Sequence, residues 1–290
     1  MGSGGAPFSG GFVTGPQASW TADPAGTLSK SGDLLVTDLK PTLTGSGFSS
    51  SDAGSYDRAV RRWIPVPRAQ VRDDGLAYSY AEPFASKPGS LNDATRIHVV
   101  SLADGTDRVI YSGSPRSVLA YETDGIYITS VVYYRDDLGS DLWRLDPATG
   151  AATAIPNGAP FEAVVGQYAF SDGGVIMPRT LVRVDIQTGA QETWFHTDGP
   201  GWIWFVGIDG SGHPIIDVSQ DVSGPKWQLE VVTAPQVLTP IATITIHALG
   251  VTDSHGTWLA GDDGVYLLRP DSTLVRVSEV TGGNIAGGCS

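Results

Sequence analysis

The sequence contains a single cysteine and few charged residues. Cys289 is the only cysteine among 290 residues, which excludes a disulfide bond within the chain. Charged residues make up 17% of the sequence, whereas roughly 25% is usual for a soluble domain. With so few charged residues, the sequence cannot form many salt bridges along helix surfaces, and this favours β structure.

Long apolar runs are also missing. No stretch approaches 18 consecutive apolar residues, and the first thirty residues lack a basic head followed by an apolar run. We therefore expect neither a membrane span nor a signal peptide in this sequence. The formal net charge is −13, and such a field repels phosphate backbones and anionic membranes. Nucleic acid and membrane insertion are thus not expected.

Motifs of several common active sites are absent. The sequence has no Gly-x-Ser-x-Gly elbow, no Walker loop and no dinucleotide fingerprint. It also lacks an EF-hand pattern and a His-Glu-x-x-His motif. The five histidines are scattered: His98, His196, His213, His247 and His255. We therefore expect no metal site and no cofactor.

What the sequence does contain is a repeat of about forty residues. In each copy a β-rich run leads into a turn rich in Asp, Pro, Thr and Gly, and a second β-rich run follows. The two best copies cover residues 142–155 and 181–194. The positions equivalent to Asp146 are 57, 101, 146, 185, 233 and 269, which gives a mean spacing of about 42 residues.

A second turn signal lies between successive copies. Asp, Ser and Gly cluster at residues 73–75, 124–125, 172–173, 209–212 and 254–256, each time between two apolar runs. Such turns supply the positive φ that a tight hairpin needs. Each period therefore holds about four short strands, which is the content of one propeller blade.

These repeats predict an all-β fold, a single β-propeller over residues 11–290. Six four-stranded blades fit the chain best, and five or seven remain alternatives. Residues 11–14 and 18–22 are predicted to supply the inner strands of the first blade. Residues 1–10, rich in Gly and Ser, are predicted to be a flexible linker or an added tag.

Two segments resemble a known family. Residues 71–80, VRDDGLAYSY, resemble the SPDGxxIAY inner hairpin of TolB-like and WD40-like β-propellers. Residues 141–150, DLWRLDPATG, are similar to the IWxxDxxTG outer hairpin of the same group. The resemblance covers about residues 56–278. Because many such propellers work outside the cytoplasm, it implies an extracellular, cell-surface or periplasmic location.

Function is expected on the loop face of the propeller. Loops between second and third strands gather there with the connections between blades, and the longest are predicted at residues 27–55, 83–95, 133–141 and 220–227. The candidate binding residues on this face are Tyr133, Tyr134, Arg135, Asp136, Asp137, His196, Trp202, Trp204, Lys226 and Trp227. Exposed aromatic rings beside charges are typical of carbohydrate and peptide sites. The alternative for Trp202 and Trp204 is packing between blades.

Three functions remain open at this point. The leading hypothesis is a non-catalytic binding module for a carbohydrate or a protein or peptide partner. The first alternative is a glycoside hydrolase or lyase that uses carboxylates near the axis, with Glu82, Glu122 and Glu162 as candidates. The second alternative is a structural assembly subunit, which would need a flat apolar patch.

Overall fold

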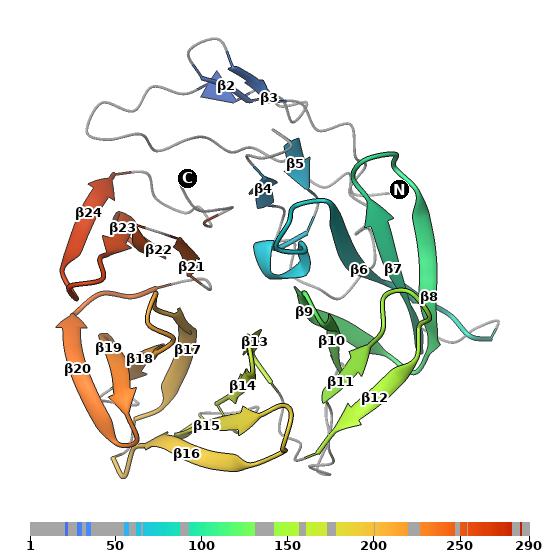
Figure 1. Cartoon of the computed structure of the whole chain (residues 1–290). Coiled ribbons are helices and arrows are strands. Elements are labelled where there is room, and N and C mark those ends of the chain that lie inside the picture. The colour runs from blue at the N-terminus through green and yellow to red at the C-terminus, as the bar shows by residue number, and fades with distance from the viewer. Residues whose placement is uncertain are drawn as a thin grey trace.

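The computed structural model arranges β-sheets in a ring around a central axis (Figure 1). It describes residues 21–22, 28–30, 33–35, 55–57, 62–64, 66–87, 93–130, 142–156, 161–172, 178–199, 201–219, 227–246, 250–253, 255–279 and 285. Within these residues every element is a strand except the short 3-10 turn η3 (Arg68–Gln70).

Four blades are complete four-stranded antiparallel sheets whose strands neighbour each other in chain order. The first comprises β9 (Arg116–Glu122), β10 (Gly125–Ser130), β11 (Leu142–Leu145) and β12 (Ala152–Ile155). The second comprises β13 (Ala163–Val165), β14 (Tyr168–Ser171), β15 (Thr180–Asp185) and β16 (Gln191–His196). The third comprises β17 (Ile203–Ile208), β18 (Pro214–Ser219), β19 (Trp227–Ala234) and β20 (Val237–Ala242). The fourth comprises β21 (Val251–Asp253), β22 (Gly256–Gly261), β23 (Gly264–Leu268) and β24 (Leu274–Ser278). In each, the earliest strand lies nearest the axis (Figure 1).

Two further positions complete the ring. One holds β6 (Ala77–Phe84), β7 (Ala94–Ser101) and β8 (Asp107–Gly113), with Val71 bridged to Tyr78 on the inner side. The other holds the hairpin of β4 (Ser55–Asp57) and β5 (Arg62–Ile64), which lies between the β6–β8 sheet and the β21–β24 sheet in Figure 1. The fold is therefore the predicted all-β propeller, with six positions around its axis.

Three local predictions were wrong. Thr21–Ala22 was assigned to the first blade, and residues 27–55 were assigned to a loop. Instead β1 (Thr21–Ala22), β2 (Leu28–Lys30) and β3 (Asp33–Leu35) form a small sheet of their own, because short connections let neighbouring segments pair locally. The predicted loop 83–95 is also shorter, since β6 and β7 stay paired as far as Phe84 and Ala94. Residues 11–14 lie outside the described part.

The Asp-rich turns of the repeat form as their residue types predict. Asp146 Oδ1 accepts hydrogen bonds from the amides of Ala148 and Thr149, at 2.7 and 3.0 Å. The turn after Asp185 repeats this geometry, and Gly150 and Gly189 follow with φ of 73° and 72°. These amides stabilise the carboxylates and lower the pKa of both aspartates. Local turn chemistry therefore sets the outer hairpins of these two blades.

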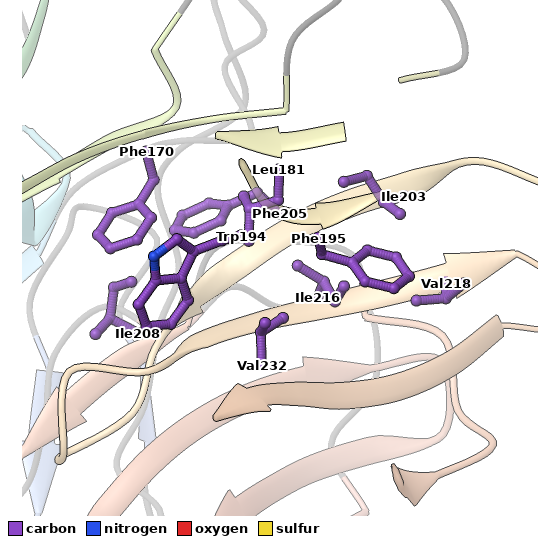
Figure 2. Close-up of a cluster of buried hydrophobic side chains, with 10 residues drawn as sticks. All are labelled: Phe170, Leu181, Trp194, Phe195, Ile203, Phe205, Ile208, Ile216, Val218 and Val232. Atoms are coloured by element: carbon purple, nitrogen blue, oxygen red, sulfur yellow. The ribbon is translucent and has the colours of Figure 1, made fainter. Parts of the chain in front are cut away.

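Apolar side chains fill the space between neighbouring blades. Figure 2 shows one such cluster, in which side chains from β14, β15 and β16 meet side chains from β17, β18 and β19. Its largest members include Phe170, Trp194, Phe195 and Phe205, all of them buried. Full burial of one such side chain contributes about 1.5–3 kcal/mol. The third blade buries one face in this cluster and the other against the fourth blade. The ring rather than the single sheet is therefore the stable unit.

Candidate functional site

The start of β17, the end of β18 and the start of β19 meet at one end of the third four-stranded blade. Ile203 pairs with Val218, and Ser219 pairs with Trp227, so the three strand ends lie side by side. The amide of Ser219 also donates to the carbonyl of Trp202, at 2.8 Å. This bond fixes the chain that enters β17 against β18. The connection that leaves β20 reaches the same end.

A cavity of about 340 Å³ opens at this place. It is lined by Trp202, Trp204, Asp217, Trp227, Thr245 and Ile246. We call it the indole pocket. Three of these six residues are tryptophans that the sequence singled out as binding candidates. Its volume lies at the lower end of the range of about 300–1,000 Å³ for small-molecule sites.

The indoles of Trp202 and Trp227 contact each other edge to face. Their ring centroids lie 5.8 Å apart, and their planes meet at 75°. Two rings at this angle form the walls of a corner, and their contact limits the rotamers of both. The pocket therefore has two mutually supporting walls.

Trp204 is the exposed member of the set. Its neighbours along β17, Ile203 and Phe205, point into the apolar cluster of Figure 2 and are buried. Because side chains alternate along a strand, Trp204 points to the opposite face, where 51% of its surface remains exposed. Trp204 is therefore not fully packed between blades, which was the alternative interpretation of this residue.

Asp217 anchors the remaining side of the pocket. Its side chain is only 1% exposed, and its Oδ2 accepts the amide hydrogen of Ile246 at 3.0 Å. Ile246 in turn forms a bridge with Gly261 in the next blade. The carboxylate thus ties the connection after β20 to β18. The pocket is lined by the third blade and by the connection that leads to the fourth.

Sequence reasoning missed Asp217, Thr245 and Ile246. A usable signal for Asp217 existed, since it interrupts the otherwise apolar run Pro-Ile-Ile-Asp-Val of β18. An acidic residue inside a strand that is buried on both faces needs a specific partner. Thr245 and Ile246 carry no such signal, because only the arrangement of blades brings them to the pocket.

The other predicted binding residues do not line this pocket or are not described. His196 is exposed at the end of β16, where its Nδ1 lies 2.9 Å from the hydroxyl of Thr180. Its Nε2 lies 3.4 Å from Asp198 Oδ1. The remaining candidates lie outside the described residues: Tyr133, Tyr134, Arg135, Asp136, Asp137 and Lys226.

Glu82, the first of the three candidate catalytic carboxylates, belongs to an ion-pair network on β6 and β7. Arg96 Nη1 lies 3.0 Å from Glu82 Oε2, and His98 Nε2 lies 3.3 Å from the same oxygen. The guanidinium of Arg96, together with His98, lowers the pKa of Glu82. Glu82 is therefore ionised at neutral pH.

Glu122 and Glu162 are held at higher pKa values. Burial, together with the carboxylates of Asp73 and Asp124, raises the pKa of Glu122 to about 7. For Glu162, the loss of water to the surrounding protein and the nearby Asp172 also raise the pKa to about 7. Both groups therefore exchange protons near neutral pH.

These two carboxylates lie toward opposite ends of β13. The amide of Gly166, just after β13, donates to Glu122, whereas Glu162 directly precedes the strand. The four steps from residue 162 to residue 166 span roughly 13 Å along an extended chain. The three candidate glutamates thus have three different sets of neighbours.

The described part of the chain has neither a metal-binding cluster nor a membrane-spanning helix. It contains no group of three or more His, Cys, Asp and Glu side chains placed to hold a metal ion. Nor does any helix in these residues have the length and apolar character needed to cross a membrane.

No family model and no curated protein matches this chain. Solved structures do share its fold. A prolyl endopeptidase from a study of two such enzymes has a TM-score of 0.53 at 13% identity, over 79% of this chain and 38% of that chain. TolB from Acinetobacter baumannii has a TM-score of 0.47 at 13% identity, over 74% of this chain and 55% of that one.

An oligogalacturonate lyase in complex with manganese has a TM-score of 0.47 at 10% identity, over 65% of this chain and 62% of that one. The chain thus spans about two fifths to three fifths of the length of these three proteins. At such low identity the likeness concerns the fold alone. The ring of antiparallel sheets makes this chain a β-propeller, and the fold-level likeness to the prolyl endopeptidase, at a TM-score of 0.53, agrees with it.

Proposed function

We propose that this chain is a non-catalytic binding module of an exported protein, and that the indole pocket is its recognition site for a peptide or a carbohydrate ligand. The observation that supports this function is the meeting of three tryptophans and a buried carboxylate in one cavity. The cavity lies where connections between blades gather, which is where propellers vary their recognition loops.

The pocket has the physical properties of a binding site. Indole rings supply large, rigid contact area at low conformational cost, and Trp204 keeps about half of its surface free for a ligand. The contact between Trp202 and Trp227 and the bond from Ile246 to Asp217 hold the lining in place before a ligand arrives. Such preorganisation reduces the entropy lost on binding.

The test is ligand capture by the purified chain on peptide and glycan arrays. We expect Trp204→Ala to weaken each captured ligand at least tenfold while the folded state persists, because the removed ring is half exposed. Trp258→Phe is the matched control, since Trp258 bonds Asp253 at 2.8 Å and does not line the pocket. Ligand binding that survives Trp204→Ala and Trp227→Ala together would exclude the pocket as the site.

One observation favours the enzymatic alternative, a propeller hydrolase or lyase. The pKa values of Glu122 and Glu162 stand near 7, the range suited to general acid–base catalysis. If this alternative holds, the chain should cleave a polysaccharide, and both Glu162→Gln and Glu122→Gln should abolish that activity. Unchanged turnover in both variants would remove these two carboxylates from consideration.

A further inference from the structure

The indole pocket pairs aromatic surface with a single kind of charge. Asp217 is the only ionisable side chain among its six lining residues. It is buried, and its Oδ2 accepts an amide hydrogen in a charge-assisted bond. A carboxylate in a largely apolar wall attracts a cation more strongly than the same group in water would. Charge complementarity therefore favours a positively charged ligand.

The three indoles favour the same kind of ligand. Tryptophan is the aromatic side chain with the strongest attraction for a cation placed over its ring. Trp202 and Trp227, at 75° to each other, offer two walls of a corner, and Trp204 adds a third ring to the cavity. A cation in this corner can contact more than one ring.

The lining also selects among cations. Besides Asp217, Thr245 is the only lining residue with a hydrogen-bonding side chain that is not an indole. A primary ammonium carries three donors that need acceptors, and a metal cation needs several oxygen ligands. A quaternary ammonium carries no N–H donor, and ring faces with one carboxylate satisfy it.

We propose that the indole pocket binds the quaternary ammonium group of a small organic cation. This inference rests on the proposed function, because it names the ligand class of that same site. The methyl groups lie against the indoles of Trp202, Trp204 and Trp227, and the carboxylate of Asp217 balances the charge. The remainder of the ligand extends toward solvent on the side of the exposed Trp204.

Titration of the full chain with choline, followed by tryptophan fluorescence and by calorimetry, tests this inference. The matched neutral probe is 3,3-dimethylbutanol, in which carbon replaces the quaternary nitrogen, and ethanolamine is the primary-amine probe. We expect choline to bind at least tenfold more tightly than either. Equal binding of choline and 3,3-dimethylbutanol would overturn the role of charge, and tighter binding of ethanolamine would overturn the preference for a quaternary group.

Two variants separate the contributions of carboxylate and ring. Asp217→Asn keeps an oxygen for the amide of Ile246 but removes the charge, and we expect at least a tenfold loss of choline affinity. Because Asp217 is buried, Trp204→Ala serves as a second variant in which folding is not at risk, and it should also weaken choline at least tenfold. Choline affinity unchanged in Trp204→Ala would overturn the inference.

The two proposals fail in different ways. If choline does not bind but a peptide or glycan does, and Trp204→Ala abolishes that binding, the pocket is a recognition site and the ammonium assignment is wrong. If arrays and choline both give no binding to the unmodified chain, the proposed function fails, and the ammonium assignment fails with it.

Discussion

Gly150 packs directly against the carbonyl oxygen of Ile110 in the neighbouring blade. A Cβ atom added at Gly150 would lie 2.1 Å from that oxygen, and the residue also has φ of 73°. The turn that ends at Gly150 is further tied to the same blade by Arg108, whose guanidinium donates to the carbonyls of Pro147 and Ala148. The outer edges of two blades therefore meet at a glycine.

Gly150→Ala is expected to destabilise the propeller by about 2–4 kcal/mol, because backbone strain and a clash with the next blade act together. Gly105→Ala is the matched control. Gly105 has φ of 72°, yet nothing lies within 4 Å of its added Cβ, so only the backbone cost of about 1 kcal/mol applies. Urea unfolding of both variants measures the difference. Equal losses would show that the packing against Ile110 is unimportant.

The raised pKa of Glu122 predicts that the free energy of unfolding depends on pH. Its pKa is about 7 in the folded chain against an ordinary 4.5, so the folded state binds more protons between these values. The contribution of Glu122 is fully present below pH 4.5 and is lost as the pH rises through 7. Because Glu122 is only partly buried, solvent screens most of this difference. Glu122→Gln should therefore stabilise the protein by about 1 kcal/mol at pH 8 and change little at pH 4. Urea midpoints at both pH values test this.

Glu82→Gln provides the control of opposite sign. The pKa of Glu82 is lowered, chiefly by Arg96, so its contribution exists above the ordinary pKa of 4.5 and disappears in acid. This variant should lose stability at pH 7 and match the parent near pH 3. A Glu122→Gln protein that behaved in the same way would contradict the assignment for Glu122.

The contacts of Arg183 predict that lysine cannot replace it without a loss of stability. Its guanidinium carbon lies 4.2 Å from the ring centres of both Tyr168 and Trp194, while Nη2 bonds Glu192 at 2.8 Å. A lysine keeps the charge but cannot stack as a plane. Arg183→Lys should cost about 1 kcal/mol of unfolding free energy.

The control for this change is Arg144→Lys. Arg144 pairs with Asp124 at 3.1 Å, and both side chains are nearly half exposed, so its replacement should cost less than about 0.5 kcal/mol. Thermal or urea denaturation compares the two variants. A larger loss for Arg144→Lys than for Arg183→Lys would show that stacking contributes little.

Truncation of Trp204 and of Trp194 should change stability by very different amounts. Trp204 is half exposed, so Trp204→Ala should change the unfolding free energy by about 1 kcal/mol or less. Trp194 is buried in the cluster of Figure 2, and Trp194→Ala should cost about 3–5 kcal/mol. Comparable losses would place Trp204 in the core.

The parts of the fold that the sequence predicted are those with local causes. The turns after Asp146 and Asp185 depend on a carboxylate and the next few amides, so their residue types alone indicate outer hairpins. The indole pocket was predicted only in part. Its tryptophans stand out as residue types. The bond between Asp217 and Ile246, by contrast, joins positions 29 residues apart and depends on how the connection after β20 folds back onto β18.

The same distinction explains the errors near the start of the chain. The repeat around residue 57 is the weakest of the six. The strands β1, β2 and β3 pair with each other, and no periodic pattern in the sequence distinguishes this small sheet from the strands of a blade. The carboxylates illustrate the limit as well. Glu82, Glu122 and Glu162 look alike in the sequence, yet Arg96 lowers one pKa while burial raises the other two.

The bond from Ile246 to Asp217 has a mechanical consequence. Ile246 lines the pocket and also forms a bridge with Gly261 of the next blade. An occupant would therefore hold the connection after β20 in place and oppose separation of the two blades. A saturating ligand should therefore slow the opening of the ring of blades and not only reduce the motion of one surface loop.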